Sequence, residues 1–153
     1  MEKRIVVLGL GNRLMSDEGV GSHIVERFQT QADKYPLVDF IDAGTGGMSI
    51  LHRIKDHEKA VIIDCAYMKT KPGTIKKFRP DEVKSVKKLA HHSLHDVDVL
   101  KIIELSKQLD QCPDKIVIFG IEPEKIEQSY ELSSSITARI DDYIITISQE
   151  LIL

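Results

Sequence analysis

Continuous apolar runs alternate along this chain with segments whose apolar residues recur at helical spacing. The runs at residues 5–10, 37–41, 60–63 and 115–121 are apolar almost throughout. Such a run is typical of a strand buried on both faces, because a half-exposed strand carries a polar residue at every second position. Residues 74–78 do alternate, which predicts an edge strand. Together these patterns predict an α/β fold with three layers, in which a twisted, mostly parallel central sheet of about five strands has helices on both faces.

Helical spacing of the apolar residues predicts the segments that cover this sheet. We expect helices at residues 17–28, at residues 48–54, after Asp96 as a cap and, with Ser133 or Ser134 as the cap, over residues 134–151. Residues 79–95 and 122–132 lack such a pattern and are expected to be long loops. Long irregular segments in compact domains are often functional.

Length and charge narrow the class of protein. At 153 residues the chain is expected to form a single domain, residues 1–153. A net charge of −3 with interleaved signs gives no basis for binding nucleic acid or a membrane surface, and no apolar stretch has the length of a membrane span. Cys65 and Cys112 form no C-x-x-C unit and fit a reducing compartment. We therefore expect a cytoplasmic protein.

Glycines after the first predicted strand invite a dinucleotide-binding interpretation. Gly9 and Gly11 fit the start of that fingerprint, but its third glycine would fall at position 14, where the chain has Leu14. Asp42 also lies farther along the chain than the acidic residue of the fingerprint. No Gly-Lys-Ser/Thr follows, so a P-loop is excluded as well. Asn12, in the same turn, fits a turn role and a functional role equally well.

Acidic and histidine side chains are expected beyond the carboxyl ends of the parallel strands. Glu18 follows the first strand, Asp64 ends the third, and His92 lies in the first long loop. The crevice beyond such strand ends is where ligands bind to an open α/β sheet, and a Glu, an Asp and a His meeting there can hold a metal ion with positions left open. Structural roles remain open: Glu18 also suits a helix N-terminus, and Asp64 a strand-end turn. His91 and His95 compete with His92.

Other hydrolase signatures are weak or missing. A nucleophilic Cys65 would need to be a thiolate, but the neighbouring carboxylate of Asp64 disfavours that charge, so we expect Cys65 to be a core residue. The sequence has no G-x-S-x-G elbow and no H-E-x-x-H helix, which argues against a serine hydrolase and a common zinc protease.

Six short segments, taken together, resemble the hydrogenase maturation endopeptidases, which trim a C-terminal tail from the large subunit of nickel-iron hydrogenases. They occur in the order of that family and span nearly the whole chain. They are Gly9-Leu10-Gly11-Asn12 with Asp17-Glu18-Gly19-Val20-Gly21, Asp42-Ala43-Gly44-Thr45-Gly46-Gly47-Met48, Ile63-Asp64-Cys65-Ala66, Pro72-Gly73-Thr74, His92-x-Leu94 and Gly120-Ile121-Glu122-Pro123-Glu124. The resemblance implies an α/β fold with a central twisted sheet, in agreement with the patterns above.

The resemblance also implies a catalytic and metal-contacting set: Glu18, Asp64 and His92. The metal would be nickel carried by the substrate, with cadmium or zinc able to substitute, and the partner would be a hydrogenase large-subunit precursor. Glu122 stands where many members of the family carry glutamine, which leaves its role open. Substrate contacts are expected from residues of the glycine-rich segments, namely Gly11, Asn12, Asp17, Asp42, Gly44, Thr45 and Gly46.

The expected function is therefore a metal-dependent endopeptidase of the aspartic or metallo type, which uses substrate-bound nickel as a recognition element. A nickel-delivery or metal-sensing module without hydrolytic activity would use the same three ligands. A small α/β hydrolase that carries its own zinc is a third interpretation.

Overall fold

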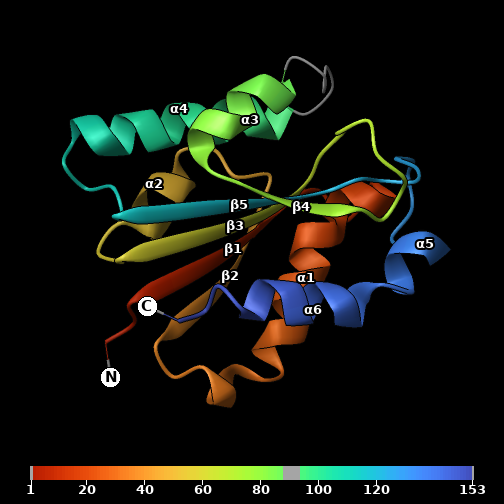
Figure 1. The fold of residues 1–153 in the computed structure, drawn as a ribbon, viewed down its shortest axis with the longest axis horizontal. Coiled ribbons are helices and arrows are strands. Elements are labelled where there is room, and N and C mark those ends of the chain that lie inside the picture. Colours follow the sequence, from red (N-terminus) through yellow and green to blue (C-terminus); the bar gives the residue numbers. More distant parts are fainter. Residues whose placement is uncertain (1, 88–93, 153) are drawn as a thin grey trace.

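A five-stranded sheet with the strand order β2-β1-β3-β5-β4 forms the centre of the protein (Figure 1). The computed structural model describes residues 2–87 and 94–152, with side chains described outside residues 84–98. The parallel strands are β1 (Ile5–Leu10), β2 (Val38–Gly44), β3 (Lys59–Cys65) and β5 (Lys115–Ile121). The short strand β4 (Ile75–Phe78) pairs antiparallel with β5 at the edge. The predicted fold class, including the edge strand, is confirmed.

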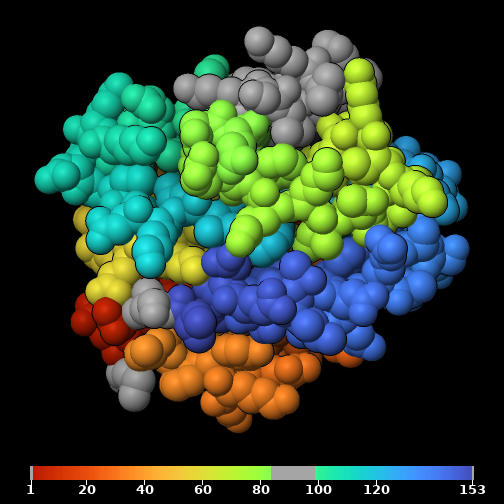
Figure 2. Space-filling view, viewed as in Figure 1, coloured from red at the N-terminus to blue at the C-terminus, as the bar shows by residue number. Residues whose placement is uncertain are grey.

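Helices cover both faces of this sheet. One face carries α1 (Val20–Gln29), α5 (Ser134–Thr137) and α6 (Ile140–Ser148), and the other carries α2 (Ser49–Ile54), α3 (Pro80–Lys87) and α4 (Leu94–Gln108). Two 3-10 helices, η1 (Ser16–Gly19) and η2 (Ala32–Lys34), flank α1. Figure 2 shows α6, in blue, lying between the orange segment before β2 and the green segment of β4 and α3. Within residues 2–87 and 94–152, no helix is long and apolar enough to cross a membrane.

Side chains of the central strands alternate between two apolar cores. In β1, Ile5 and Val7 join the core beneath α1 and α6, whereas Val6, Leu8 and Leu10 join the core beneath α2 and α4. Every residue of β1 is buried. Because removal of apolar surface from water is the main favourable term in folding, a strand that is apolar throughout is stable only in such a central position.

Helix α1 lies unusually close to the sheet because it presents a glycine there. A Cβ atom on Gly21 would lie 2.3 Å from the carbonyl oxygen of Ile63 in β3 and 2.5 Å from that of Leu10 in β1. Only glycine leaves room for the helix backbone to rest directly on the two strands. This close approach fixes η1, which immediately precedes α1, beside the carboxyl ends of β1 and β3.

Three sequence predictions for the helices were wrong in part. Residues 79–95 are not a loop throughout, because α3 occupies Pro80–Lys87; its proline suits a first helical turn, and the Glu82 side chain accepts the backbone N–H of Arg79 at 2.8 Å. Helix α4 begins at Leu94 rather than after Asp96. The last helix is divided into α5 and α6, which are separated at Ala138 and Arg139.

Candidate functional site

The carboxyl ends of β1 and β3 form the topological switch point of the sheet. From β1 the chain passes through α1 to β2 on one side, and from β2 it crosses back through α2 to β3 on the other side of β1. Since α1 and α2 lie on opposite faces, the connections diverge between β1 and β3. A crevice at such a point is the usual ligand-binding place of an open α/β sheet.

Asp64 supplies a buried carboxylate at this end of the sheet. It is the penultimate residue of β3 and only 2% exposed, and its Oδ1 atom accepts the backbone N–H of Cys65 at 2.8 Å. The residue lines a small cavity with apolar side chains from β1, β3, β5, α3 and α4, which are Leu10, Ile62, Val83, Val99, Leu100 and Ile118. A carboxylate in apolar surroundings needs hydrogen-bond donors or a cation to compensate its charge, so this place is compatible with a positively charged ligand.

Glu18 comes to the same end of the sheet from the side of β1. It lies in η1, which contacts β3, and its side chain is partly buried. Two of the three predicted metal ligands, Glu18 and Asp64, thus belong to segments that meet beyond the strand ends. Across the part of the chain that the structure describes, no three His, Cys, Asp or Glu side chains group closely enough to hold a metal ion.

The third predicted ligand lies outside the described residues. His92 and its neighbour His91 fall in residues 88–93, and His95 is in α4 but its side chain is not described. Helix α4 begins two positions after His92, and residues of its second turn, Val99 and Leu100, share the cavity of Asp64. The second turn of α4 therefore lies close to Asp64, and the choice among the three histidines stays a prediction.

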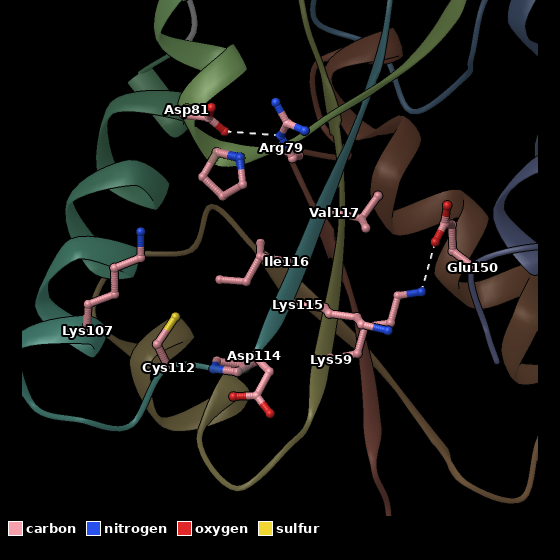
Figure 3. A pocket seen from close by; sticks show the side chains of 12 residues that line it. Lys59, Arg79, Asp81, Lys107, Cys112, Asp114, Lys115, Ile116, Val117 and Glu150 are labelled. Carbon is pink, nitrogen blue, oxygen red and sulfur yellow. Dashed lines mark hydrogen bonds and ion pairs between the residues drawn. The ribbon is translucent and has the colours of Figure 1, made fainter. Parts of the chain in front are cut away.

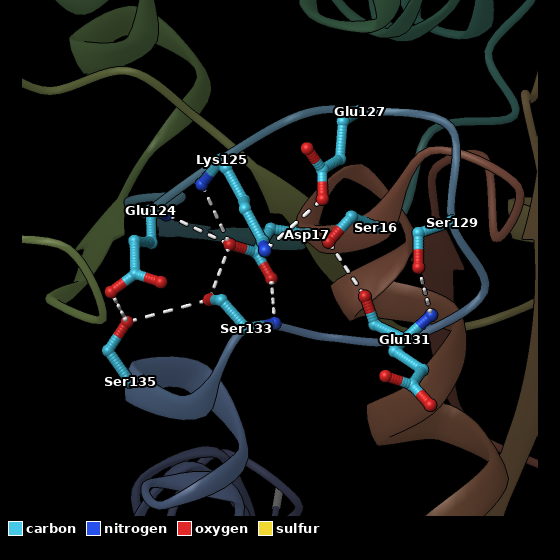
Figure 4. Close-up of polar contacts among 9 residues, drawn as sticks. All are labelled: Ser16, Asp17, Glu124, Lys125, Glu127, Ser129, Glu131, Ser133 and Ser135. Carbon is cyan, nitrogen blue, oxygen red and sulfur yellow. Dashed lines mark hydrogen bonds and ion pairs between the residues drawn. The ribbon is translucent and has the colours of Figure 1, made fainter.

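Asp17 has a structural role in its own chain, and its contact with substrate stays a prediction. Its side chain is 0% exposed, and its two carboxylate oxygens accept hydrogen bonds from Glu124, Lys125 and Ser133 (Figure 4). These four hydrogen bonds hold the buried carboxylate against its own chain.

The first glycine turn is likewise occupied by the chain itself. Gly11 has φ 125°, and a Cβ atom there would lie 1.9 Å from the carbonyl oxygen of Glu18, so the missing side chain makes room for η1 rather than for substrate. The side-chain oxygen of Asn12 accepts the backbone N–H of Leu14 at 2.9 Å, which is the turn role that the sequence left open. Gly11 and Asn12 thus make internal contacts, and their predicted contacts with substrate stay predictions.

The second glycine turn is open to an approaching chain. Gly44 and Gly47 have φ values of 55° and 76°, and a Cβ atom on either would meet nothing within 4 Å. Asp42 and Thr45 are exposed in the same segment, and Asp42 Oδ1 accepts the Ser22 hydroxyl at 2.7 Å and the N–H of Gly44 at 3.1 Å. At the intervening Gly46 a Cβ atom would lie 2.7 Å from the Ile50 side chain. This turn, joined to the first by a 2.7 Å hydrogen bond from Gly11 N to Gly44 O, is the accessible part of the predicted substrate-binding set.

Sequence reasoning left two residues near this site without a role. Glu122, only 5% exposed, follows β5, and its Oε1 atom accepts the N–H groups of Met68 and Thr70 and the Thr70 hydroxyl at 2.7, 3.1 and 3.0 Å. Burial raises the pKa of Tyr67, and the negative charges of Glu122, Glu18 and Asp17 raise that pKa further. Tyr67 therefore lies within the field of the site carboxylates. Its position three residues after Asp64 was the only signal for it in the sequence.

Cys65 is a core residue, as predicted. It is 5% exposed and belongs to the core beneath α1 and α6, together with Val61 and Ile63 of the same strand. Asp64 faces the other side of β3, because successive side chains of a strand point to opposite faces.

A separate groove lies at the opposite end of the sheet (Figure 3). It runs along the first half of β5 and contains the ion pair of Lys59 and Glu150, whose atoms are 2.8 Å apart. The side chain of Glu150 also binds Lys77, and hydrogen bonds from both lysines lower its pKa. The groove is remote from Glu18 and Asp64, so it is not part of the candidate site.

Comparisons with known proteins agree with this fold. A family model described as hydrogenase maturation protease matches residues 22–150. The hydrogenase 2 maturation protease of Escherichia coli K12 is 32% identical over 141 residues, which cover 90% of this chain and 84% of that protein. The hydrogenase expression/formation protein HupD of Bradyrhizobium diazoefficiens is 31% identical over 82% of this chain, which spans 66% of the length of that relative.

Solved structures match the fold as well. The structure of the hydrogenase maturating endopeptidase HybD from Escherichia coli matches with a TM-score of 0.84 and 27% identity, covering 97% of this chain and 91% of that chain. HybD from Thermococcus kodakarensis matches with a TM-score of 0.78 and 25% identity over 97% and 99%.

Proposed function

The chain belongs to the hydrogenase maturation protease family, and from this premise we propose that it removes the C-terminal extension of the nickel-loaded large-subunit precursor of a nickel-iron hydrogenase. The observation that carries the proposal is the arrival of two carboxylates, Glu18 and Asp64, at the β1–β3 switch point from separate segments. A protease role in hydrogenase maturation follows from the family. Nickel recognition rests on the chemistry of the site, and the cut at the C-terminus rests on the family resemblance.

Glu18 and Asp64, with a histidine from residues 91–95, make an incomplete set of ligands. Carboxylate and imidazole groups suit a borderline divalent ion such as nickel or zinc. Three protein ligands leave coordination positions for groups of another molecule. Such a set fits an ion that arrives already bound to the precursor, and this protein then needs no resident metal of its own.

Hydrolysis of a peptide bond needs a polarised carbonyl and an activated water, both of which a divalent ion can supply. In this proposal the protein's own residues fix the position of the scissile bond relative to that ion. Asp64 is held by its own strand and by the N–H of Cys65, so it keeps its orientation when the substrate enters. The open turn at Gly44 and Gly47 allows the backbone of the tail to approach the sheet edge closely.

Nickel-loaded precursor should be cleaved and nickel-free precursor should be left intact. Without the shared ion, the carboxylates of Glu18 and Asp64 repel each other and bind the precursor weakly. The measurement is a parallel digest of the two precursor forms, with the released peptide identified by mass. Equal cleavage of both forms would remove nickel from the recognition step, and cleavage of neither by folded protein would favour the nickel-delivery alternative.

Both cysteine variants should retain cleavage. Cys65 packs in the core on the face of β3 opposite Asp64, and burial raises the pKa of the Cys112 thiol in the remote groove, so neither thiol is activated. Cys65→Ser and Cys112→Ser should process nickel-loaded precursor within about threefold of the wild-type rate, since neither touches the reacting atoms. Loss of activity in folded Cys65→Ser protein, verified by circular dichroism, would instead indicate a cysteine protease.

A further inference from the structure

The buried carboxylate of Asp17 is stabilised by a distant segment of the chain. Oδ2 accepts the N–H groups of Glu124 and Lys125 at 2.9 and 3.1 Å and the hydroxyl of Ser133 at 2.6 Å, and Oδ1 accepts the N–H of Ser133 at 2.8 Å (Figure 4). All four donors belong to the connection between β5 and α5, which we call the 122–133 loop. Hydrogen bonds to an ionised group are about twice as strong as neutral ones, so Asp17 is a firm anchor for that loop.

The residue before Asp17 is held by the same loop. Ser16 donates its backbone N–H to Ser129 O at 2.8 Å and its hydroxyl to Glu131 O at 2.7 Å, and Ser129 returns an N–H to Leu14 O at 2.9 Å. Ser16 has φ 53°, a left-handed conformation that is unfavourable for a residue other than glycine. Such a conformation persists only where the surrounding structure enforces it. The shape of η1 therefore depends on the 122–133 loop.

Glu18 is the next residue along η1, the segment that contacts β3, and its side chain is partly buried. We propose that Asp17 is a positioning residue, which fastens η1 to the 122–133 loop and thereby holds Glu18 in place for a metal ion. In this proposal the two adjacent acidic residues have different roles: Asp17 binds its own chain, and Glu18 binds the metal ion. This inference rests on the proposed function, because the role of Glu18 belongs to it.

Two substitutions disturb this anchor to different extents. In Asp17→Asn the side-chain NH2 group must face at least one of the four donors, whichever way the amide turns. Ser133→Ala removes only the hydroxyl donor and keeps the backbone N–H of Ser133. The matched control is Glu127→Gln, which lies in the same loop and breaks only an exposed ion pair with Lys125 Nζ at 3.1 Å.

The test measures the affinity of each variant for Cd²⁺ alone by isothermal titration, and the amide hydrogen exchange of the 122–133 loop. Asp17→Asn should bind Cd²⁺ at least about tenfold more weakly, the usual effect of removing a group that orients a metal ligand. Ser133→Ala should show a smaller loss of the same kind, and Glu127→Gln none. The amides of Glu124, Lys125 and Ser133 should exchange faster in Asp17→Asn.

A double-mutant cycle with Glu18→Gln separates positioning from general destabilisation. If Asp17 acts through Glu18, then Asp17→Asn should cause no further loss of Cd²⁺ affinity when Glu18 is already Gln. An equal loss in both backgrounds would overturn the positioning role, as would wild-type affinity in Asp17→Asn. If Asp17→Asn does not fold, Ser133→Ala takes its place in the cycle.

Failure of the inference and failure of the proposed function are told apart by one further variant in the precursor digest. Wild-type cleavage by Asp17→Asn together with lost cleavage by Glu18→Gln would overturn the inference and leave the function intact. Wild-type cleavage by Glu18→Gln would overturn both. A wild-type protein that binds no Cd²⁺ would overturn the inference alone, because the proposed function has the ion arrive with the precursor.

Discussion

Asp64→Asn protein should be folded and unable to process nickel-loaded precursor. Removal of the charge takes away an anionic ligand whose contribution to the transition state is expected to be several kcal/mol, which corresponds to a rate loss on the order of a thousandfold. The fold should tolerate the change, because the amide oxygen can still accept the N–H of Cys65 and the neutral side chain is less costly to bury than a carboxylate. The measurements are the initial rate of peptide release and the midpoint of thermal unfolding.

Asp33→Asn is the matched control for this variant. Asp33 is an exposed acid in η2, which precedes the amino end of β2, whereas the candidate site lies at the carboxyl ends of the strands. The same loss of one charge there should change neither the rate nor the midpoint. Cleavage at the wild-type rate by Asp64→Asn would exclude this carboxylate from the chemistry and from nickel recognition.

Gly21→Ala should be strongly destabilised, by about 3 kcal/mol in the free energy of unfolding, near the upper end of the usual cost of overpacking. The added methyl group would lie 2.3 Å and 2.5 Å from two backbone oxygens, and neither β1 nor β3 can move away without disturbing the centre of the sheet. Urea unfolding measures the difference. Cleavage should fall as well, since α1 would have to lift away from the strands together with η1.

Gly47→Ala is the comparison that separates the steric clash at Gly21 from the general effect of replacing a glycine by alanine. Its φ of 76° imposes left-handed strain on alanine, which costs about 1 kcal/mol, but the methyl group meets no atom within 4 Å. Equal stability of the two variants would mean that α1 is less tightly seated on the sheet than the close approach at Gly21 requires.

The layers and strand positions of this fold were predictable from hydrophobic pattern alone. Strand β5 was predicted at its observed bounds, residues 115–121, because the run is apolar and ends in residues that mark a loop. Helix α3 was missed because its first four residues contain one buried aliphatic side chain, that of Val83. A single such side chain does not make a repeating apolar pattern. The break between α5 and α6 was missed for a different reason: the Arg139 and Tyr143 side chains both donate to the carbonyl oxygen of Gly73, at 3.0 and 2.6 Å, and periodicity contains no information about such distant contacts.

The sequence predicted where the site lies, at the carboxyl ends of the strands, but not the role of each residue in it. Asp64 could be placed because it follows a buried strand, whereas Asp17 and Glu18 could not be assigned separate roles because both suit the start of a helix. Most of the groups that donate hydrogen bonds to Asp17 are backbone N–H groups. Every non-proline residue has such a group, so the sequence does not reveal which ones bind Asp17. The open second turn and the filled first turn were also alike in sequence, since both are rich in glycine.

The hydrogen bonds of Asp17 span 107, 108 and 116 positions of the chain. Contacts of such high sequence separation form late, because a long loop must close before they are gained. On the ribosome, strands β1, β2 and β3 can pair while the 122–133 loop has not yet been synthesised. A nascent chain that already has these strands in place still lacks the anchor that shapes η1. Peptidase competence should therefore be acquired among the last steps of biosynthesis, after the loop that follows β5 has emerged.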